Sequence, residues 1–224
     1  ALLRKAKTQI IIAGGGARHA AADIRALAEQ QGIPVVTTNS GKGILPENHP
    51  LSLGSSLPFA PTRARIAAAD VVLALGTRLN PFSTLPGYGI DYWPKDAKVI
   101  QVDINPDRIG LTKKVTVGIV GDAAKVAKGI TAALSDTAGD AGRADRKALI
   151  AQTKSAWAQE LSSLDHEQDD PGTTWNERAR AARPDWMSPR QAWRAIQAGM
   201  PEDAIISSDI GNNCAIGNAY PSFP

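Results

Sequence analysis

The segment Gln9–Val36 predicts a strand, a glycine turn, a helix and a second strand in immediate succession. Ile10–Ile12 is a β-branched apolar run without polar alternation, which is typical of a strand buried on both faces of a parallel sheet. The glycines at positions 14–16 allow close approach of another backbone or a ligand. Apolar residues at helical spacing over residues 18–31 end at Gly32, a favoured position for a helix-terminating glycine. The pattern predicts a βαβ unit, and the amino end of its helix could hold an anion.

The glycine turn only partly fits the dinucleotide-binding fingerprint G-x-G-x-x-G. Gly14 and Gly16 occupy the first two glycine positions, but His19 occupies the third. The next predicted strand runs into residues 37–39, two threonines and an asparagine, which offer no acid for a ribose hydroxyl. A standard NAD-dependent dehydrogenase is therefore disfavoured. Two roles stay open for the turn, which are ligand contact and close packing of a helix on a sheet.

Strand-like and helix-like segments alternate through the first 135 residues. Further strands are predicted at residues 71–75, 99–102 and 115–117, and further helices at residues 62–69 and 123–134, the last capped by Asp122. Residues 37–54 are rich in glycine, proline, asparagine and serine and are predicted to be a long loop, in which His49 bonds a backbone group. The alternation predicts a doubly wound α/β domain with a parallel sheet over residues 1–135.

Polar and small residues follow three of the predicted strands, where ligands bind in open parallel sheets. They are Gly14, Gly15, Gly16, Gly76, Thr77, Arg78, Asp103 and Asn105. Arg78 could pair with a phosphate and Asp103 with a ribose hydroxyl, which predicts a nucleotide site. The alternatives are a surface ion pair for Arg78 and a turn cap for Asp103.

Composition narrows the range of partners. The chain has 25 basic and 22 acidic residues, a net charge of +3, and no dense basic run with interleaved aromatics, so nucleic acid is not expected as a partner. Cys214 is the single cysteine, so no internal disulfide forms, which suits a reducing cytoplasm. No apolar run approaches the length of a membrane span, and the three histidines have no metal-ligand spacing.

The remaining chain predicts a connection and the beginning of another domain. Residues 136–185 form a linker containing a helix over residues 147–164, with Leu149, Ile150, Trp157 and Leu161 spaced for one buried face. From residue 186 the sequence predicts a helix over residues 188–198 and a strand over residues 204–208. One strand and a helix cannot bury themselves. We therefore expect residues 186–224 to begin a second, incomplete α/β domain of a longer protein.

Several motifs together resemble one family. They are the glycine turn, Gly41-Lys42-Gly43, Pro46-Glu47, His49-Pro50, Ala69–Arg78, Val102-Asp103-Ile104-Asn105, Gly121-Asp122, Pro201–Ile206 and Ser208–Gly211. This set resembles the thiamine-diphosphate enzymes of the acetolactate synthase type, over nearly the whole chain. Within that family, the segment Ser208–Tyr220, with Asn80–Thr84 and Tyr92-Trp93-Pro94, is most similar to the sulfoacetaldehyde acetyltransferase branch.

The resemblance implies a bacterial enzyme of sulfonate breakdown that converts sulfoacetaldehyde and phosphate to acetyl phosphate and sulfite. It implies thiamine diphosphate and Mg2+ as cofactors and an active site between subunits, hence a dimer or tetramer. By family position, Asp209, Gly211, Asn212 and Asn213 would approach the cofactor diphosphate, although a simple turn cap is an alternative. The activating glutamate and the metal-binding segment have no counterpart here, so no catalytic residue or metal ligand is named, and the chain alone is expected to be inactive.

Two alternative functions stay open for this chain. Some relatives bind FAD or ADP in the central domain, and an acetolactate synthase with FAD is the rival enzyme. A non-catalytic nucleotide-binding module, as in NAD-binding deacetylases, is the rival of another class. The lone Cys214 argues against the deacetylase, because a zinc site of paired cysteines cannot form.

Overall fold

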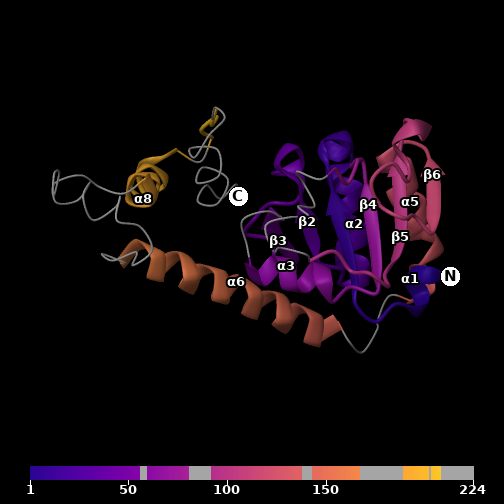
Figure 1. Cartoon of the computed structure of the whole chain (residues 1–224), viewed down its shortest axis with the longest axis horizontal. Helices are drawn as coiled ribbons and strands as arrows, with labels where there is room; N and C mark the ends of the chain where they lie inside the picture. The colour runs from indigo at the N-terminus through magenta and orange to yellow at the C-terminus, as the bar shows by residue number, and fades with distance from the viewer. Residues whose placement is uncertain (56–59, 81–91, 138–142, 167–188, 202, 208–224) are drawn as a thin grey trace. The chain divides into compact units, whose positions relative to one another are not determined.

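The computed structural model describes residues 1–55, 60–80, 92–137, 143–166, 189–201 and 203–207 (Figure 1). The chain divides into two compact units, residues 1–154 with 223–224, and residues 155–222. The first unit contains a six-stranded, all-parallel sheet in the order β3-β2-β1-β4-β5-β6. The strands are β1 (Gln9–Ala13), β2 (Val35–Thr37), β3 (Ser52–Ser55), β4 (Val71–Leu75), β5 (Lys98–Asp103) and β6 (Val117–Val120). The predicted doubly wound α/β fold is confirmed.

The centre of the sheet is the pair β1 and β4. They run in register from Gln9 beside Val71 to Ala13 beside Leu75, and every residue of both strands is buried. The chain moves outward from β1 to β2 and β3, and then outward in the other direction from β4 to β5 and β6. The strand order therefore reverses between β1 and β4, and this reversal opens a crevice at their carboxyl ends.

Two helices lie side by side on the sheet, α2 (Ala21–Gln31) and α5 (Ala123–Ala133). The residues before α2 form a 3-10 helix, Gly15–Ala20, so the predicted helix over residues 18–31 begins with a tighter turn. Gly32 ends α2 in the left-handed conformation, and its N–H donates to the carbonyl of Ala28, as predicted. Asp122 caps α5 by accepting the N–H of Lys125, also as predicted.

Among its described residues, the first unit also contains α1 (Leu2–Lys5), α3 (Ala60–Ala67) and the first part of α6 (Arg143–His166), with short 3-10 turns at Asn39–Gly41, Pro106–Arg108 and Ser135–Thr137. Arg65 of α3 donates through Nε to the hydroxyl of Thr153 at 3.0 Å. Of the apolar face predicted on α6, Ile150 is buried and Trp157 is half-buried, while the side chain of Leu161 lies outside the described residues. The prediction is wrong for Leu149, which is 37% exposed, and the polar Thr153 is buried together with Ile150.

Two strands of the sheet differ from the sequence prediction. The predicted loop over residues 37–54 contains β3, which pairs with β2 at Val35 beside Ser52 and Thr37 beside Ser55. Pairing with a neighbour, rather than apolar pattern, makes this serine-containing segment a strand. β6 lies two residues later than predicted and is an edge strand, with Val117 38% and Val120 60% exposed.

In the second unit, the predicted helix is present as α8 (Pro189–Gly199). The predicted strand over residues 204–208 is wrong for residues 204–207, which are not in a strand, and Ile205 is exposed. Within the described residues no strand pairs with this segment, and an extended segment becomes a strand only through such pairing. Among the helices described, none combines the length and apolar character that a membrane span requires.

Candidate functional site

A pocket of about 390 Å³ lies at the carboxyl ends of the central strands. Its lining is Gly15, Gly16, Thr38, Ser40, Gly76, Thr77, Arg78, Asn80, Asp103, Ile104, Asn105 and Arg108. The structure therefore brings together all the strand-end residues singled out from the sequence except Gly14. A pocket at the point where strand order reverses is the usual ligand position in this architecture.

The glycines at the floor of the pocket allow the turns after β1 and β4 to touch. The N–H of Gly14 donates to the carbonyl of Leu75 at 2.9 Å, and that of Gly16 donates to the carbonyl of Gly76 at 3.0 Å. A Cβ added to Gly14 would lie 2.6 Å from the Cβ of Thr77, and Gly76 has a φ of 57°. Gly14 thus serves close packing, while Gly15 and Gly16 also border the pocket.

The walls carry positive charge on two separate segments. Arg78 follows β4 and is exposed, and Arg108 ends the short turn after β5. Asp103 is the acid at this wall, and one of its oxygens accepts the N–H of Asn105 at 2.9 Å. The predicted alternative of a turn cap is therefore true of Asp103, and its second oxygen has no partner among the described residues.

The site residues predicted from the sequence did not include five of the lining residues, Thr38, Ser40, Asn80, Ile104 and Arg108. Thr38, Asn80 and Ile104 follow the carboxyl ends of β2, β4 and β5, so the strand-end rule could have found them. Ile104 is 77% exposed and gives the pocket an apolar rim. No local signal marks Arg108, because it reaches the pocket only through the fold of its turn.

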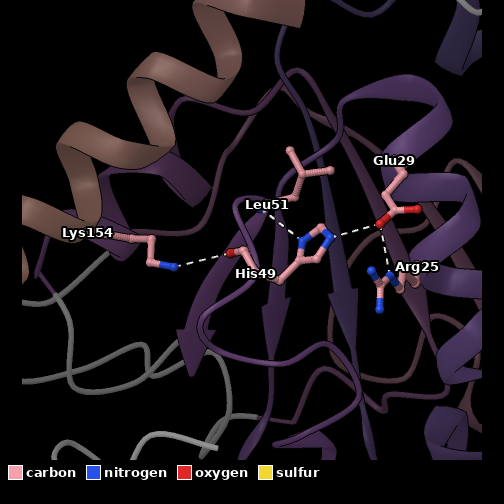
Figure 2. Close-up of polar contacts among 5 residues, drawn as sticks. All are labelled: Arg25, Glu29, His49, Leu51 and Lys154. Carbon is pink, nitrogen blue, oxygen red and sulfur yellow. Dashed lines mark hydrogen bonds and ion pairs between the residues drawn. The ribbon is translucent and has the colours of Figure 1, made fainter. Parts of the chain in front are cut away.

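The loop histidine His49 has a structural role, as expected from the sequence. Figure 2 shows its ring between the backbone of Leu51 and the carboxylate of Glu29. The N–H of Leu51 donates to Nδ1 at 3.1 Å, so the ring proton is on Nε2, 3.0 Å from Glu29. Hydrogen bonds from Arg25 and then His49 lower the pKa of Glu29. Lys154 donates to the carbonyl of His49 at 3.2 Å, so this loop is fixed from two sides.

Two other polar pairs are formed by residues that do not line the pocket. Nε2 of His19 lies 2.7 Å from Asp122, so the residue at the third fingerprint position contacts the cap of α5. Lys42 lies 3.4 Å from Glu47, and burial lowers the pKa of Lys42 while the Glu47 carboxylate opposes that shift. Within the described ranges, no three His, Cys, Asp or Glu side chains are grouped as metal ligands.

The residues assigned by resemblance to thiamine diphosphate, Asp209, Gly211, Asn212 and Asn213, lie outside the described residues. Their role stays a prediction.

Comparison with known proteins places the chain in a family. Residues 1–130 match the model of the thiamine pyrophosphate enzyme central domain. Over 99% of its length the chain is 68% identical to the sulfoacetaldehyde acetyltransferase of Roseovarius nubinhibens, and over its whole length 63% identical to that of Rhodobacter capsulatus. It spans 38% of the length of both relatives.

More distant matches cover less of the chain. A probable acetolactate synthase large subunit of Methanocaldococcus jannaschii is 39% identical over 59% of the chain and 23% of that relative. A solved structure described as that of a putative thiamin diphosphate-dependent enzyme from Mycobacterium smegmatis has a TM-score of 0.51 at 25% identity, covering 62% of this chain and 27% of that one. The chain therefore belongs to the thiamine pyrophosphate enzymes, and residues 1–130 are the central domain of that family.

Proposed function

We propose that the protein containing this chain is a sulfoacetaldehyde acetyltransferase, which converts sulfoacetaldehyde and phosphate to acetyl phosphate and sulfite. The observation that carries the proposal is a difference in similarity. Two relatives with that name, and a third named a probable sulfoacetaldehyde acetyltransferase, are 62–68% identical over at least 99% of the chain. The oxalyl-CoA decarboxylase and acetolactate synthase relatives are 38–39% identical over 59% of it.

The cofactors follow from the same proposal. Thiamine diphosphate, held with Mg2+, would supply the carbanion chemistry that this reaction requires. We propose Asp209, Gly211, Asn212 and Asn213 as the diphosphate contacts, because their sequence combines small residues and short amides with little charge. The chain alone, without the segments that activate the cofactor in the family, is expected to be inactive.

A substrate panel on the full-length protein tests the activity. The protein with thiamine diphosphate and Mg2+ should release sulfite and acetyl phosphate in equal amounts from sulfoacetaldehyde and phosphate. Acetolactate formation from pyruvate without sulfite release from sulfoacetaldehyde would instead support the acetolactate synthase alternative. The same panel with the 224-residue chain alone should give no turnover.

We further propose that the strand-end pocket binds the ADP moiety of a nucleotide, either ADP itself or FAD. Arg78 and Arg108 offer donors for phosphates, the second oxygen of Asp103 can accept from a ribose hydroxyl, and Ile104 offers an apolar surface for the base. Its volume of about 390 Å³ is within the range of small-molecule sites.

Thermal unfolding tests this pocket. A ligand that binds only the folded state at a hundred times its Kd stabilises it by about 2.7 kcal/mol, which is a shift of roughly 5–10 °C for a chain of this size. ADP should produce such a shift, and Arg78→Ala should reduce it. Arg25→Ala is the matched control, because Arg25 is an exposed arginine on α2 that pairs with Glu29. No shift at millimolar ADP or FAD would leave the glycine turn with a packing role only.

We propose that the full-length protein is cytoplasmic and forms a dimer or tetramer. The resemblance to enzymes with active sites between subunits supports self-association, and the presence of a single cysteine in the 224 residues of this chain suits a reducing compartment. Light scattering on the purified full-length protein decides between monomer, dimer and tetramer.

A further inference from the structure

The side chain of Gln101 connects two segments that border the pocket. Gln101 lies on β5 and is 1% exposed. Its Nε2 donates to the carbonyl of Thr77 at 3.1 Å and to that of Arg108 at 3.0 Å. Its Oε1 accepts the N–H of Gly110 at 2.9 Å. One buried amide thus holds the turn after β4 and the turn after β5.

The three partners leave only one orientation for this amide. Both carbonyl oxygens need a donor, and the N–H of Gly110 needs an acceptor, so nitrogen and oxygen cannot be exchanged. Each of these backbone groups would lose its partner if the side chain were apolar, and a buried unpaired group is strongly unfavourable. The amide therefore fixes the relative position of the two turns.

A second contact connects the same segments. The hydroxyl of Thr112 lies 3.0 Å from the carbonyl of Arg78 and 2.7 Å from that of Leu79. Gln101 holds the backbone at Thr77, just before Arg78, and at Arg108 itself. The two arginines are thus carried by turns that are bonded to each other across β5.

We propose that Gln101 is a positioning residue for anion recognition, because it sets the spacing of Arg78 and Arg108 around the phosphates of a bound nucleotide. The identity of the anion as a nucleotide phosphate depends on the nucleotide pocket proposed above. A phosphate group contacted from two sides binds well only if both cations are already in place, since ordering them on binding weakens affinity.

The first test needs no ligand and uses amide hydrogen exchange on the full chain. Gln101→Met should speed exchange at Gly110 by about tenfold or more and also speed it across residues 77–80. Gln31→Met is the matched control, because Gln31 is another buried glutamine whose Nε2 donates to the carbonyl of Leu134. Exchange at both pocket turns unchanged from wild type, or increased equally by the control, would overturn the positioning role.

The second test compares ADP with adenosine by calorimetry. Wild type should bind ADP more tightly than adenosine, and Gln101→Met should remove at least about tenfold of that preference. Gln31→Met should retain it. Gln101 is proposed to act through the arginines, so its substitution should matter less when Arg78 is already absent. Adding Gln101→Met to Arg78→Ala should therefore reduce the preference for ADP over adenosine much less than adding it to wild type does. Equal weakening of ADP and adenosine would contradict the proposal.

The two tests separate the two proposals. A wild-type chain that binds neither ligand refutes the nucleotide pocket and with it anion recognition by Gln101, whereas faster exchange at both turns would still establish the structural link. Normal exchange in Gln101→Met with intact ADP binding would refute the positioning role and leave the nucleotide pocket in place.

Discussion

Arg146 of α6 donates to the carbonyl oxygen of Gln31 at 2.9 Å, and its Nε donates to the carbonyl of Gly32 at 3.2 Å. These carbonyls are at the carboxyl end of α2, where a helix has unpaired acceptors and a partial negative charge. A cation from a segment more than a hundred residues away thus caps the carboxyl end of α2.

Removing this cap should destabilise the domain. Arg146→Ala is expected to lower the free energy of unfolding by about 1–2 kcal/mol, because two charged hydrogen bonds and a favourable helix-end charge are lost. Urea unfolding measures the change. Lys147→Ala removes an exposed cation from the adjacent position of α6 and should change stability by less than about 0.5 kcal/mol. Equal effects of the two variants would contradict the capping role.

Two glycine substitutions should have opposite effects. Gly76 has a φ of 57°, and a Cβ there would lie 2.5 Å from the backbone nitrogen of Ala17, so Gly76→Ala should destabilise by about 2–4 kcal/mol. Gly129 lies inside α5 with no atom within 4 Å of an added Cβ, so Gly129→Ala should stabilise by about 0.5–1 kcal/mol. Denaturant unfolding of both variants measures the two changes in stability. A Gly76→Ala protein as stable as wild type would show that the turns after β1 and β4 can move apart at no cost.

The cap of α5 should make stability depend on acidity. The N–H of Lys125, and then His19, lower the pKa of Asp122 below its ordinary value of 3.8. The Asp122 carboxylate therefore takes up a proton more readily in the unfolded chain than in the folded one. The stabilisation that the ionised cap gives to the folded state is complete well above pH 3.8 and is lost as pH falls through the folded pKa. Melting temperatures from pH 6 down to 3 should fall less steeply in Asp122→Asn than in wild type, whereas Asp145→Asn, at an exposed position of α6, should retain the wild-type slope.

Substitutions at Asn212 and Cys214 should have different effects on the full-length protein. Asn212→Leu should weaken thiamine diphosphate binding by about 1–3 kcal/mol, or roughly ten- to a hundredfold, because one polar partner of the diphosphate is removed. Cys214→Ser should retain most activity, since a packing role is expected for this residue. Calorimetric titration with the cofactor and steady-state turnover measure the two effects. Unchanged affinity in the first variant, or lost turnover with normal cofactor binding in the second, would overturn the assignment.

The sequence was sufficient for the centre of the fold. Residues 10–12 and 71–75 are apolar throughout, and residues 99–102 are apolar except for Gln101. Such runs are typical of buried parallel strands, so β1, β4 and β5 could be predicted. β3 could not, because Ser52 and Ser55 are buried only through their position beside β2. Edge and short strands owe their existence to pairing, which a local pattern does not contain.

The same division applies to the pocket. The residues directly after β1, β4 and β5 could be predicted from the rule that parallel strands share one carboxyl edge. Arg108 could not, because the amide of Gln101 holds its turn, and a glutamine on a strand gives no sign of its partners in the sequence. The role of that pocket, and of the tail beyond Ser207, stays a prediction.

The exposed edge of β6 has a consequence for handling the isolated chain. Val117 and Val120 are exposed there, and within the described sheet the outer side of this strand has no neighbour. Such edges can join from one molecule to the next through main-chain hydrogen bonds, which leads to aggregation at high concentration. Val120→Lys would place a charge on that edge and should raise the solubility limit of the purified chain without disturbing the buried strands.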